Sequence, residues 1–148
     1  MKITICGSTT FKEKMLEYQE KLQELWHEAI VHPDYGCYIR WEKQDVREIV
    51  QKEHARAKRE NDYIRRYHNA IMWSDGILVL NFDKKWIVNY IGCNTLMEIA
   101  SAYNAGKKVF LMNPIPQQDY IRDEINAIDP IIINWDLNQI LPAGRQVK

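Results

Sequence analysis

This chain has no long hydrophobic run, and none of its stretches approaches the roughly eighteen apolar residues that a membrane-spanning helix requires. The apolar run at residues 1–7 is too short for a secretory signal peptide and lacks a cleavage pattern. The chain also has no excess charge of one sign, because 20 Lys and Arg residues balance 20 Asp and Glu residues. A balanced surface offers no general attraction for nucleic acid or an acidic membrane. We therefore expect neither a membrane nor a nucleic acid as partner.

Cysteines are few, and the three present, Cys6, Cys37 and Cys93, lie far apart. An odd number of separated cysteines argues against a disulfide framework and favours reduced thiols, so we expect a cytoplasmic protein. Cys6 is interpreted as a small core residue, and Cys93 as either a packing residue or a reactive thiol. The four histidines form no ligand cluster with the cysteines, so the sequence predicts no metal site.

Short apolar segments alternate with segments of helical periodicity along the chain. The length of 148 residues predicts a single domain over residues 1–141, followed by a frayed tail at 142–148. The predicted strands are 2–6, 28–32, 77–80, 108–112 and 130–133. The predicted helices are one beginning at Phe11, an unbroken helical segment over 42–73, and helices at 95–105 and 118–128. This order is typical of a flavodoxin-like or Rossmann-like three-layer α/β sandwich, with a five-stranded parallel sheet in the order 2-1-3-4-5.

In such a sheet, ligands bind where the loops after the first, third and fourth strands converge. These loops are residues 7–10, 81–95 and 113–116. Gly7, Ser8 and Thr9 offer backbone N–H groups and hydroxyls at a helix N-terminus, which suit a phosphate or a sugar hydroxyl. The loop is neither a P-loop nor a Rossmann dinucleotide fingerprint, because it lacks the residues of both. Asn113 is expected to reach the same crevice from the fourth strand.

The segment after the third strand carries the most informative residues of the chain. Gly92 and Asn94 precede Thr95, and Glu98 follows three residues later. Spacing alone favours a capping box, in which the Thr95 and Glu98 side chains satisfy free N–H groups at the helix start. The alternative is that the Glu98 carboxylate, in the first turn of the helix, faces the ligand crevice.

Four motifs together resemble the nucleoside 2-deoxyribosyltransferase-like family. They are ICGS after the first strand, SDGILVLN at the third, IGCNTLMEIASAYNAGKKVFLMNPIP across the fourth, and EINAIDPIIIN at the end. The resemblance covers residues 3–141, and its most specific part is 75–116. The helix signature of that family is a glycine loop, a glutamate, and a helix of small residues ending in Gly-Lys. Glu98, Ala102, Gly106 and Lys107 match it.

The resemblance implies cleavage of an N-glycosidic bond in a nucleoside or nucleoside 5′-monophosphate. Glu98 would be the nucleophile, forming a glycosyl ester that a second base or water resolves. Gly7 and Ser8 are similar to the 5′-phosphate loop of related nucleotide hydrolases. The pattern that contains Gly92, Asn94 and Thr95 is similar to that of cytokinin-activating phosphoribohydrolases. The resemblance implies a homodimer or larger assembly, and we expect no cofactor.

Two positions depart from the family pattern. Thr4 stands where the family carries a tyrosine, and Tyr67 stands where it carries an aspartate that protonates the leaving base. Tyr67 or the neighbouring His68 is the predicted replacement donor, although His68 also suits an ordinary helix position. The departures favour an alternative function, a non-catalytic nucleotide-binding sensor. A flavodoxin that binds FMN fits less well, because the first loop lacks the usual run of Ser and Thr.

Overall fold

Five parallel strands form one sheet in the order β2-β1-β3-β4-β5, which confirms the fold predicted from the sequence. The computed structural model describes residues 1–31, 54–60 and 62–142. The expectations for the first part of the helical segment 42–73 and for the tail beyond 142 fall outside these ranges. The strands span Lys2–Gly7 (β1), Glu28–Ile30 (β2), Gly76–Leu80 (β3), Lys108–Leu111 (β4) and Ile131–Ile132 (β5).

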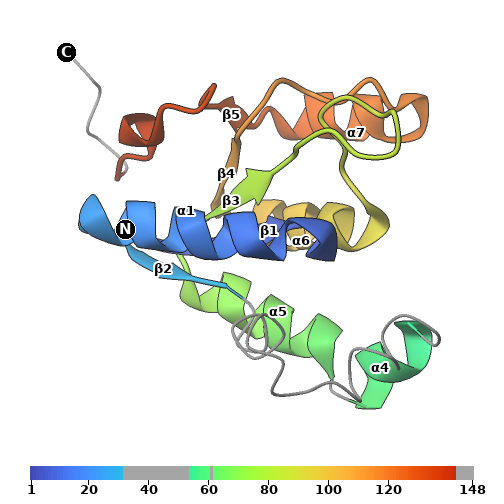
Figure 1. Cartoon of the computed structure of the whole chain (residues 1–148), viewed down its shortest axis with the longest axis horizontal. Coiled ribbons are helices and arrows are strands. Elements are labelled where there is room, and N and C mark those ends of the chain that lie inside the picture. The colour runs from blue at the N-terminus through green and yellow to red at the C-terminus, as the bar shows by residue number, and fades with distance from the viewer. Residues whose placement is uncertain (32–53, 61, 143–148) are drawn as a thin grey trace.

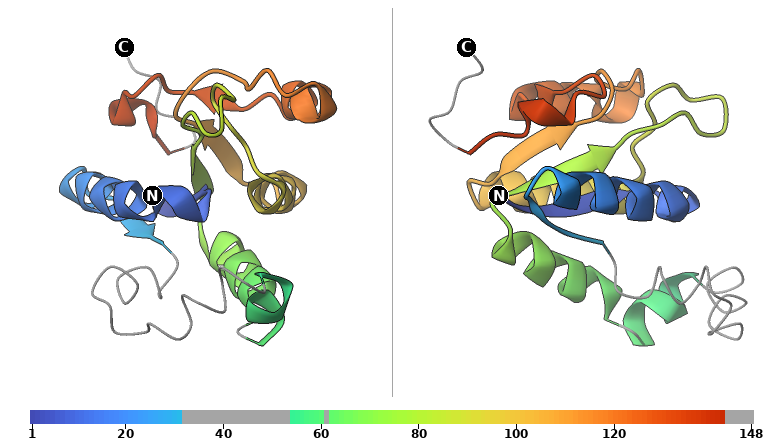
Figure 2. Two further views of the ribbon diagram at one scale, coloured as in Figure 1. Left: turned by 45° about the vertical axis from the view of Figure 1, so that its right-hand side comes forward. Right: turned by 60° about the vertical axis from the view of Figure 1, so that its left-hand side comes forward.

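Helices cover both faces of the sheet. They span Lys12–Glu24 (α1), His54–Glu60 (α4), Tyr63–Trp73 (α5), Cys93–Asn104 (α6) and Asp119–Ile128 (α7), with 3₁₀ turns at Thr9–Phe11 (η1) and Leu137–Gln139 (η2). Figure 2 (left) shows α1 on one side of the sheet and α5, α6 and α7 on the other. Burial on both faces explains why β3 is an uninterrupted apolar run. Among the residues that the structure describes, no helix is long and apolar enough to cross a membrane.

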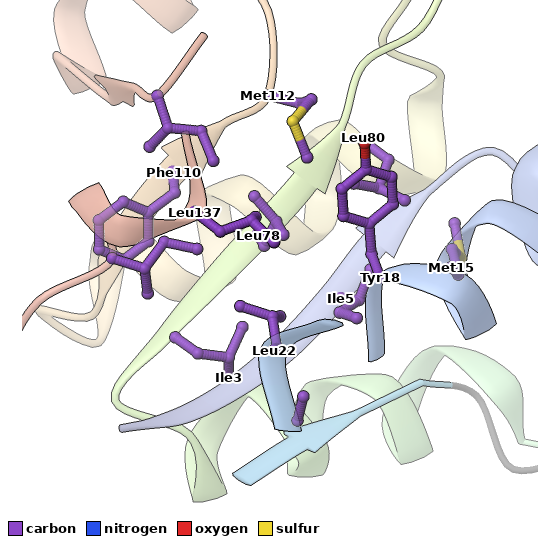
Figure 3. Close-up of a cluster of buried hydrophobic side chains, with 13 residues drawn as sticks. Ile3, Ile5, Met15, Tyr18, Leu22, Leu78, Leu80, Phe110, Met112 and Leu137 are labelled. Atoms are coloured by element: carbon purple, nitrogen blue, oxygen red, sulfur yellow. The ribbon is translucent and has the colours of Figure 1, made fainter. Parts of the chain in front are cut away.

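The core consists of two apolar clusters, one on each face of the sheet. Successive side chains of a strand point to opposite faces, and β1 divides its residues accordingly. Ile3 and Ile5 enter the cluster beneath α1, where Leu22 packs against the sheet (Figure 3). Cys6 enters the opposite cluster, together with Ile99 of α6. The alternation of β1 therefore directs Cys6 toward the face that carries α5 and α6.

The unbroken helical segment expected over 42–73 is interrupted, and this expectation is wrong. α4 ends at Glu60, and α5 begins at Tyr63 after Asp62. The φ of Asp62 is 50°, in the left-handed region that aspartate adopts more readily than most residues. A helix can therefore break here without the glycine or proline that marks a break in a sequence. Figure 1 shows α4 turned away from the axis of α5.

The predicted helix stop at Gly106 is confirmed. Gly106 has a φ of 66°, and α6 ends two residues before it, at Asn104. The N–H of Gly106 donates to the carbonyl of Tyr103 at 3.0 Å, and that of Lys107 donates to the carbonyl of Ala102 at 2.9 Å. This pair of bonds is the Schellman motif, which satisfies carbonyls left free at a helix end. It directs the chain from α6 into β4.

The carboxyl ends of the strands meet at one side of the sheet, which we call the carboxyl edge. The loops after β1, β3 and β4 begin there, and α6 starts at the same edge. Two elements flank this edge (Figures 1 and 2, right): helix α4, and the yellow-green loop that follows β3. Asp75 lies at the opposite edge, where its Oδ2 accepts a hydrogen bond from the Lys2 N–H at 2.8 Å. This bond joins the entrance of β3 to the start of β1.

Candidate active site

The first loop leaves β1 in a conformation that favours glycine. Gly7 has a φ of 155°, and a Cβ at this position would lie 2.9 Å from Met15 Cε. Ser8 is the N-cap of η1, and its Oγ accepts a hydrogen bond from the Thr10 N–H at 3.3 Å. Thr9 is exposed to solvent. The loop is thus a tight, capped turn at the carboxyl edge.

A lysine from the loop after β3 reaches this turn. Lys84 Nζ donates a hydrogen bond to Ser8 Oγ at 2.6 Å and lies 5.2 Å from the centre of the Tyr90 ring. Burial, and then the charge of Lys85, lower the pKa of Lys84. The next two residues, Lys85 and Trp86, have φ values of 50° and 65°. Trp86 therefore stands fully exposed on a left-handed turn.

The capping box predicted for Thr95 and Glu98 is wrong. The N-cap of α6 is Gly92, and no side chain forms a capping hydrogen bond there. Thr95 is the third residue of α6 and is buried, whereas a capping box places its threonine at the N-cap. Glu98 is the sixth residue of α6 and lies in its second turn rather than its first. The position of this carboxylate therefore needs another explanation.

The side chain of Glu98 faces the end of β1. Its carboxyl group lies close enough to the Cys6 thiol for the two groups to influence each other's pKa. Glu98 Oε2 exposes less than 1 Å² and has no hydrogen-bond partner among the residues described. A buried polar atom without a partner typically destabilises a protein by about 1–3 kcal/mol, and by more if it is charged. Such an atom in a native protein calls for an explanation, such as a catalytic role, a bound water, an ion or a ligand.

Burial raises the pKa of Glu98 to about 8, while the hydrogen bond from Cys6 and the charge of Lys58 act to lower it. Burial also raises the pKa of the Cys6 thiol well above its usual value, and the charge of Glu98 and its hydrogen bond raise it further. Both groups are therefore mostly protonated at neutral pH. A carboxyl group that titrates near neutrality is a candidate for acid–base or nucleophilic chemistry.

Lys58 connects α4 to the start of α6. Its Nζ donates a hydrogen bond to Asn94 Oδ1 at 3.0 Å, and its positive charge acts on Glu98. Lys58 belongs to the segment 51–66 of the sequence, which is densely charged with both signs. At Lys58, at least, a cation from this segment contacts a residue predicted to bind substrate.

The two predicted proton donors of α5 lie in different surroundings. Tyr67 is buried, and its hydroxyl donates a hydrogen bond to the carbonyl of Ile5 at 3.0 Å. His68 is exposed, and its Nδ1 lies 2.6 Å from Ser101 Oγ, one turn of α6 beyond Glu98. Tyr67 therefore contacts β1 close to its carboxyl end, and His68 lies on the surface between α5 and α6. Their roles as donors stay predictions.

Thr4 serves to join β1 to α5. Its Oγ1 donates a hydrogen bond to the carbonyl of Ala70 at 3.0 Å, and the residue is buried. The hydroxyl at the position of the family tyrosine is thus engaged with the backbone of a neighbouring helix.

Asn113 is held by Asn81, and we call this pair the amide clamp. The Asn81 Nδ2 donates to the carbonyls of Asn113 and Pro114 at 3.0 and 3.1 Å. In return, the Asn113 N–H donates to Asn81 Oδ1 at 2.9 Å, and its Nδ2 donates to the Asn81 carbonyl at 3.1 Å. The clamp joins the ends of β3 and β4 at the carboxyl edge. A contact of Asn113 with substrate stays a prediction.

The structure places three predicted site residues against partners that the sequence interpretation did not identify. Ser8 contacts a lysine of the next loop, Asn94 contacts a lysine of α4, and Glu98 lies near a cysteine of β1. These partners are Lys84, Lys58 and Cys6. The nearness of Cys6 to Glu98 could have been predicted from the alternation of β1, which places Cys6 on the face that carries α6. The contacts of the two lysines could not, because their flexible side chains and their partners are far apart in sequence and meet only in the folded chain.

No group of three or more His, Cys, Asp or Glu side chains in the described part of the chain is arranged to hold a metal ion. Comparisons of the chain with protein-family models, with curated proteins and with solved structures found no match. The function must therefore be argued from the residues themselves.

Proposed function

We propose that this protein cleaves the N-glycosidic bond of a nucleoside or nucleoside 5′-monophosphate, with Glu98 as nucleophile. The observation that carries the proposal is the half-buried Glu98, whose Oε2 atom is buried and has no partner among the described residues. It lies at the carboxyl edge of a parallel sheet, where α/β proteins of this kind bind their ligands. The sequence resemblance to the nucleoside 2-deoxyribosyltransferase-like family supports the same assignment.

The chemistry has two displacement steps at the anomeric carbon. In the first, a carboxylate oxygen of Glu98 attacks C1′ and the bond from C1′ to the base nitrogen breaks. The electron pair of that bond leaves with the base, which takes up a proton, and a glycosyl ester remains on Glu98. In the second step, water or the nitrogen of a second base attacks C1′ and loses its proton, and the ester bond breaks to restore the carboxylate. Retaining glycosidases divide their reaction in the same way.

The proton for the leaving base comes, in this proposal, from Tyr67 or His68. Tyr67 must release the carbonyl of Ile5 to act as donor. His68 already lies beside Ser101 on the helix that carries Glu98. Separate substitution of the two residues, with base release followed across pH, assigns the donor.

The pairing of Ser8 with Lys84 supports a subsite for a 5′-phosphate. The Lys84 ammonium is partly buried, which lowers its pKa and makes an anionic partner favourable. Ser8 follows Cys6 by two residues, so its Cα lies within roughly 7 Å of that of Cys6. This separation is comparable to the width of a ribose. A sugar whose C1′ faces Glu98 can therefore place its 5′ substituent near Ser8 and Lys84.

A second candidate function is a nucleotide-binding sensor without turnover. The observation that favours it is the protonation of Glu98 at neutral pH, because a neutral carboxyl group can donate a hydrogen bond to a ribose hydroxyl. Thr4 and Tyr67, which replace the family tyrosine and aspartate, point in the same direction. A sensor binds the nucleotide and releases no free base.

The test is incubation of the protein with a panel of nucleosides and 5′-nucleotides, followed by chromatography for free base. We expect release by the wild-type protein and a loss of several orders of magnitude in Glu98→Gln, because an amide cannot form the ester. Glu124→Gln, on the exposed side of α7, is the matched control and should retain activity. A 2-fluoro-2-deoxy nucleoside should add its glycosyl mass to the peptide that contains Glu98. Binding without base release would favour the sensor.

We further propose that the protein works as a homodimer or larger assembly. The resemblance supports this, because that family completes its site with residues of a neighbouring subunit. A closed symmetric assembly is the usual form of such oligomers.

A further inference from the structure

Three polar residues, Asn94, Glu98 and Ser101, follow one face of α6. Residues three and four positions apart on a helix are neighbours on its surface. Lys58 of α4 donates to Asn94 Oδ1 at 3.0 Å, at one end of this row. His68 of α5 lies 2.6 Å from Ser101 Oγ, at the other end. Between them, Glu98 Oε2 is buried and has no hydrogen-bond partner among the described residues.

The contact with Lys58 fixes which way the Asn94 amide faces. A lysine ammonium has three donors and no acceptor, so it binds the oxygen of an amide and not the nitrogen. The Nδ2 group, which carries two N–H donors, therefore occupies the other branch of the amide. Asn94 is exposed, and no described residue accepts a hydrogen bond from its Nδ2. Asn94 thus offers a donor and Glu98 an acceptor, one helical turn apart.

A hydroxyl group fits this pair, because it donates one hydrogen bond and accepts another. Side chains at positions i and i+4 have Cβ atoms about 5–6 Å apart. Two hydrogen bonds of about 2.8 Å to one oxygen span a similar distance. The last torsion of a glutamate is broad, so the carboxyl group can turn Oε2 toward a ligand. A phosphate fits less well, because an ionised Glu98 would repel it.

The proposed chemistry identifies which hydroxyl this is. In a β-ribonucleoside, the base and the 2′-hydroxyl lie on opposite faces of the sugar ring. A carboxylate that displaces the base in line approaches C1′ from the face opposite the base, which is the face of the 2′-hydroxyl. When one oxygen of Glu98 attacks C1′, the other lies next to the substituent on C2′. Retaining glycosidases use hydrogen bonds to a 2-hydroxyl in this way.

We infer that the protein recognises ribose rather than 2-deoxyribose: the 2′-hydroxyl donates to Glu98 Oε2 and accepts from Asn94 Nδ2, which Lys58 orients. The inference rests on the proposed function, in which Glu98 is the nucleophile. It departs from the 2-deoxyribosyl group after which the family that the sequence resembles is named. Asn94 is then a specificity-determining residue that touches the substrate, and Lys58 is a positioning residue. The bond from the 2′-hydroxyl also favours the ionised carboxylate that the attack requires.

The first test compares kcat/KM for base release from a ribonucleoside and from its 2′-deoxy counterpart with the same base. The 2′-deoxy bond is intrinsically more labile, so the measure is the change in the ratio of the two values between wild type and variant. Asn94→Ala should lower kcat/KM for the ribonucleoside about tenfold and leave the 2′-deoxy value nearly unchanged. Lys58→Met should shift the ratio in the same direction. Asn104→Ala, at the exposed far end of α6, is the matched control and should keep the wild-type ratio.

Two results of this test would overturn the inference. One is a ratio in Asn94→Ala that equals the wild-type ratio, because Asn94 would then have no part in sugar selection. The other is an equal loss on both sugars, because Asn94 would then bind a group that the two substrates share. Thermal unfolding of each variant confirms that it is folded.

The second test does not depend on turnover. In a C-nucleoside the base is joined to C1′ by a carbon–carbon bond and cannot be released. Calorimetry should give the wild type a Kd about tenfold lower for a ribosyl C-nucleoside than for its 2′-deoxy counterpart, since the deoxy sugar leaves Oε2 without a donor. The difference should shrink in Asn94→Ala and persist in Asn104→Ala. Equal Kd values for the two sugars in the wild type would overturn the inference.

The two tests separate this inference from the proposed function. If the ribosyl C-nucleoside binds more tightly through Asn94 but no nucleoside or nucleotide releases base, the proposed function fails and the recognition of ribose stands. If base is released through Glu98 but Asn94 does not affect the choice of sugar, only the inference fails. Absence of both binding and base release would overturn the two together.

Discussion

Replacement of Glu98 by glutamine should stabilise the protein by an amount that grows as the pH rises. The folded-state pKa of Glu98 is raised to about 8 from an ordinary value of 4.5. Between these values the folded chain keeps a proton that the unfolded chain has released. Stability then falls with rising pH, because the folded state binds more protons than the unfolded state. Glutamine does not titrate, so Glu98→Gln escapes this loss.

The magnitude follows from the width of the titration window. One pH unit corresponds to about 1.4 kcal/mol when the two states differ by one bound proton. Between about pH 5 and pH 8, the difference in free energy of unfolding between Glu98→Gln and the wild type should therefore grow by roughly 4 kcal/mol in favour of the variant. For a domain of this size, about 2–4 °C of Tm accompanies each kcal/mol, so the gap in Tm should widen by about 10 °C.

The assay is urea unfolding of both proteins at matched pH values, with Glu124→Gln as the control. Glu124 is exposed on α7, so this control removes a surface carboxylate from the same protein. Groups common to the two proteins cancel in the comparison, so the trend belongs to residue 98. A difference that stays constant across the window would refute the reasoning. So would a wild type that gains stability relative to Glu98→Gln as the pH rises, which is the behaviour of a carboxylate stabilised by its surroundings.

Two further predictions concern residues of the carboxyl edge, and a third concerns the oligomeric state. Gly7→Ala should lower the free energy of unfolding by about 2 kcal/mol, because the alanine Cβ would clash with Met15 Cε and the φ at this position is unfavourable for alanine. Equal midpoints of urea unfolding for variant and wild type would contradict this. Lys84→Met should raise KM for a 5′-monophosphate about tenfold and leave KM for the matching nucleoside nearly unchanged, since only the phosphate loses a cation; an equal rise for both substrates would remove the phosphate role. Light scattering at micromolar concentration should give a mass above the 17.6 kDa of one chain, and a monomer would count against the proposed assembly.

The sheet could be predicted because its strands are buried on both faces and therefore appear as short apolar runs. The runs at β1, β3 and β4 match the structure to within one residue at each end. The stop of α6 could also be predicted, because a glycine there takes the left-handed conformation. The break at Asp62 could not, because no glycine or proline marks it and aspartate takes a positive φ only at a minority of positions.

The capping box failed for a reason that involves a distant residue. The side chain of Gln118 is buried and exchanges two hydrogen bonds with the backbone of Ile91, at 2.7 and 3.0 Å. These bonds hold the chain just before Gly92, so the helix can begin at Cys93 without a side-chain cap. The Thr-x-x-Glu spacing is a local pattern and contains no information on Gln118. The contacts of Lys58 and Lys84 escaped prediction for the same reason, because each joins segments that are distant in sequence.

The alternation of β1 has a consequence for how the sequence can vary. Ile3 and Ile5 face the cluster beneath α1, where other aliphatic side chains of similar volume can be accommodated by small shifts of their neighbours. Thr4 and Cys6 face α5 and α6, and each contributes a donor atom, to the carbonyl of Ala70 and to that of Thr4 respectively. A saturation library over these four codons should therefore give a tolerance profile with a period of two. Conservative aliphatic exchanges should survive at the odd positions, while the even positions should accept only side chains that match both size and polarity.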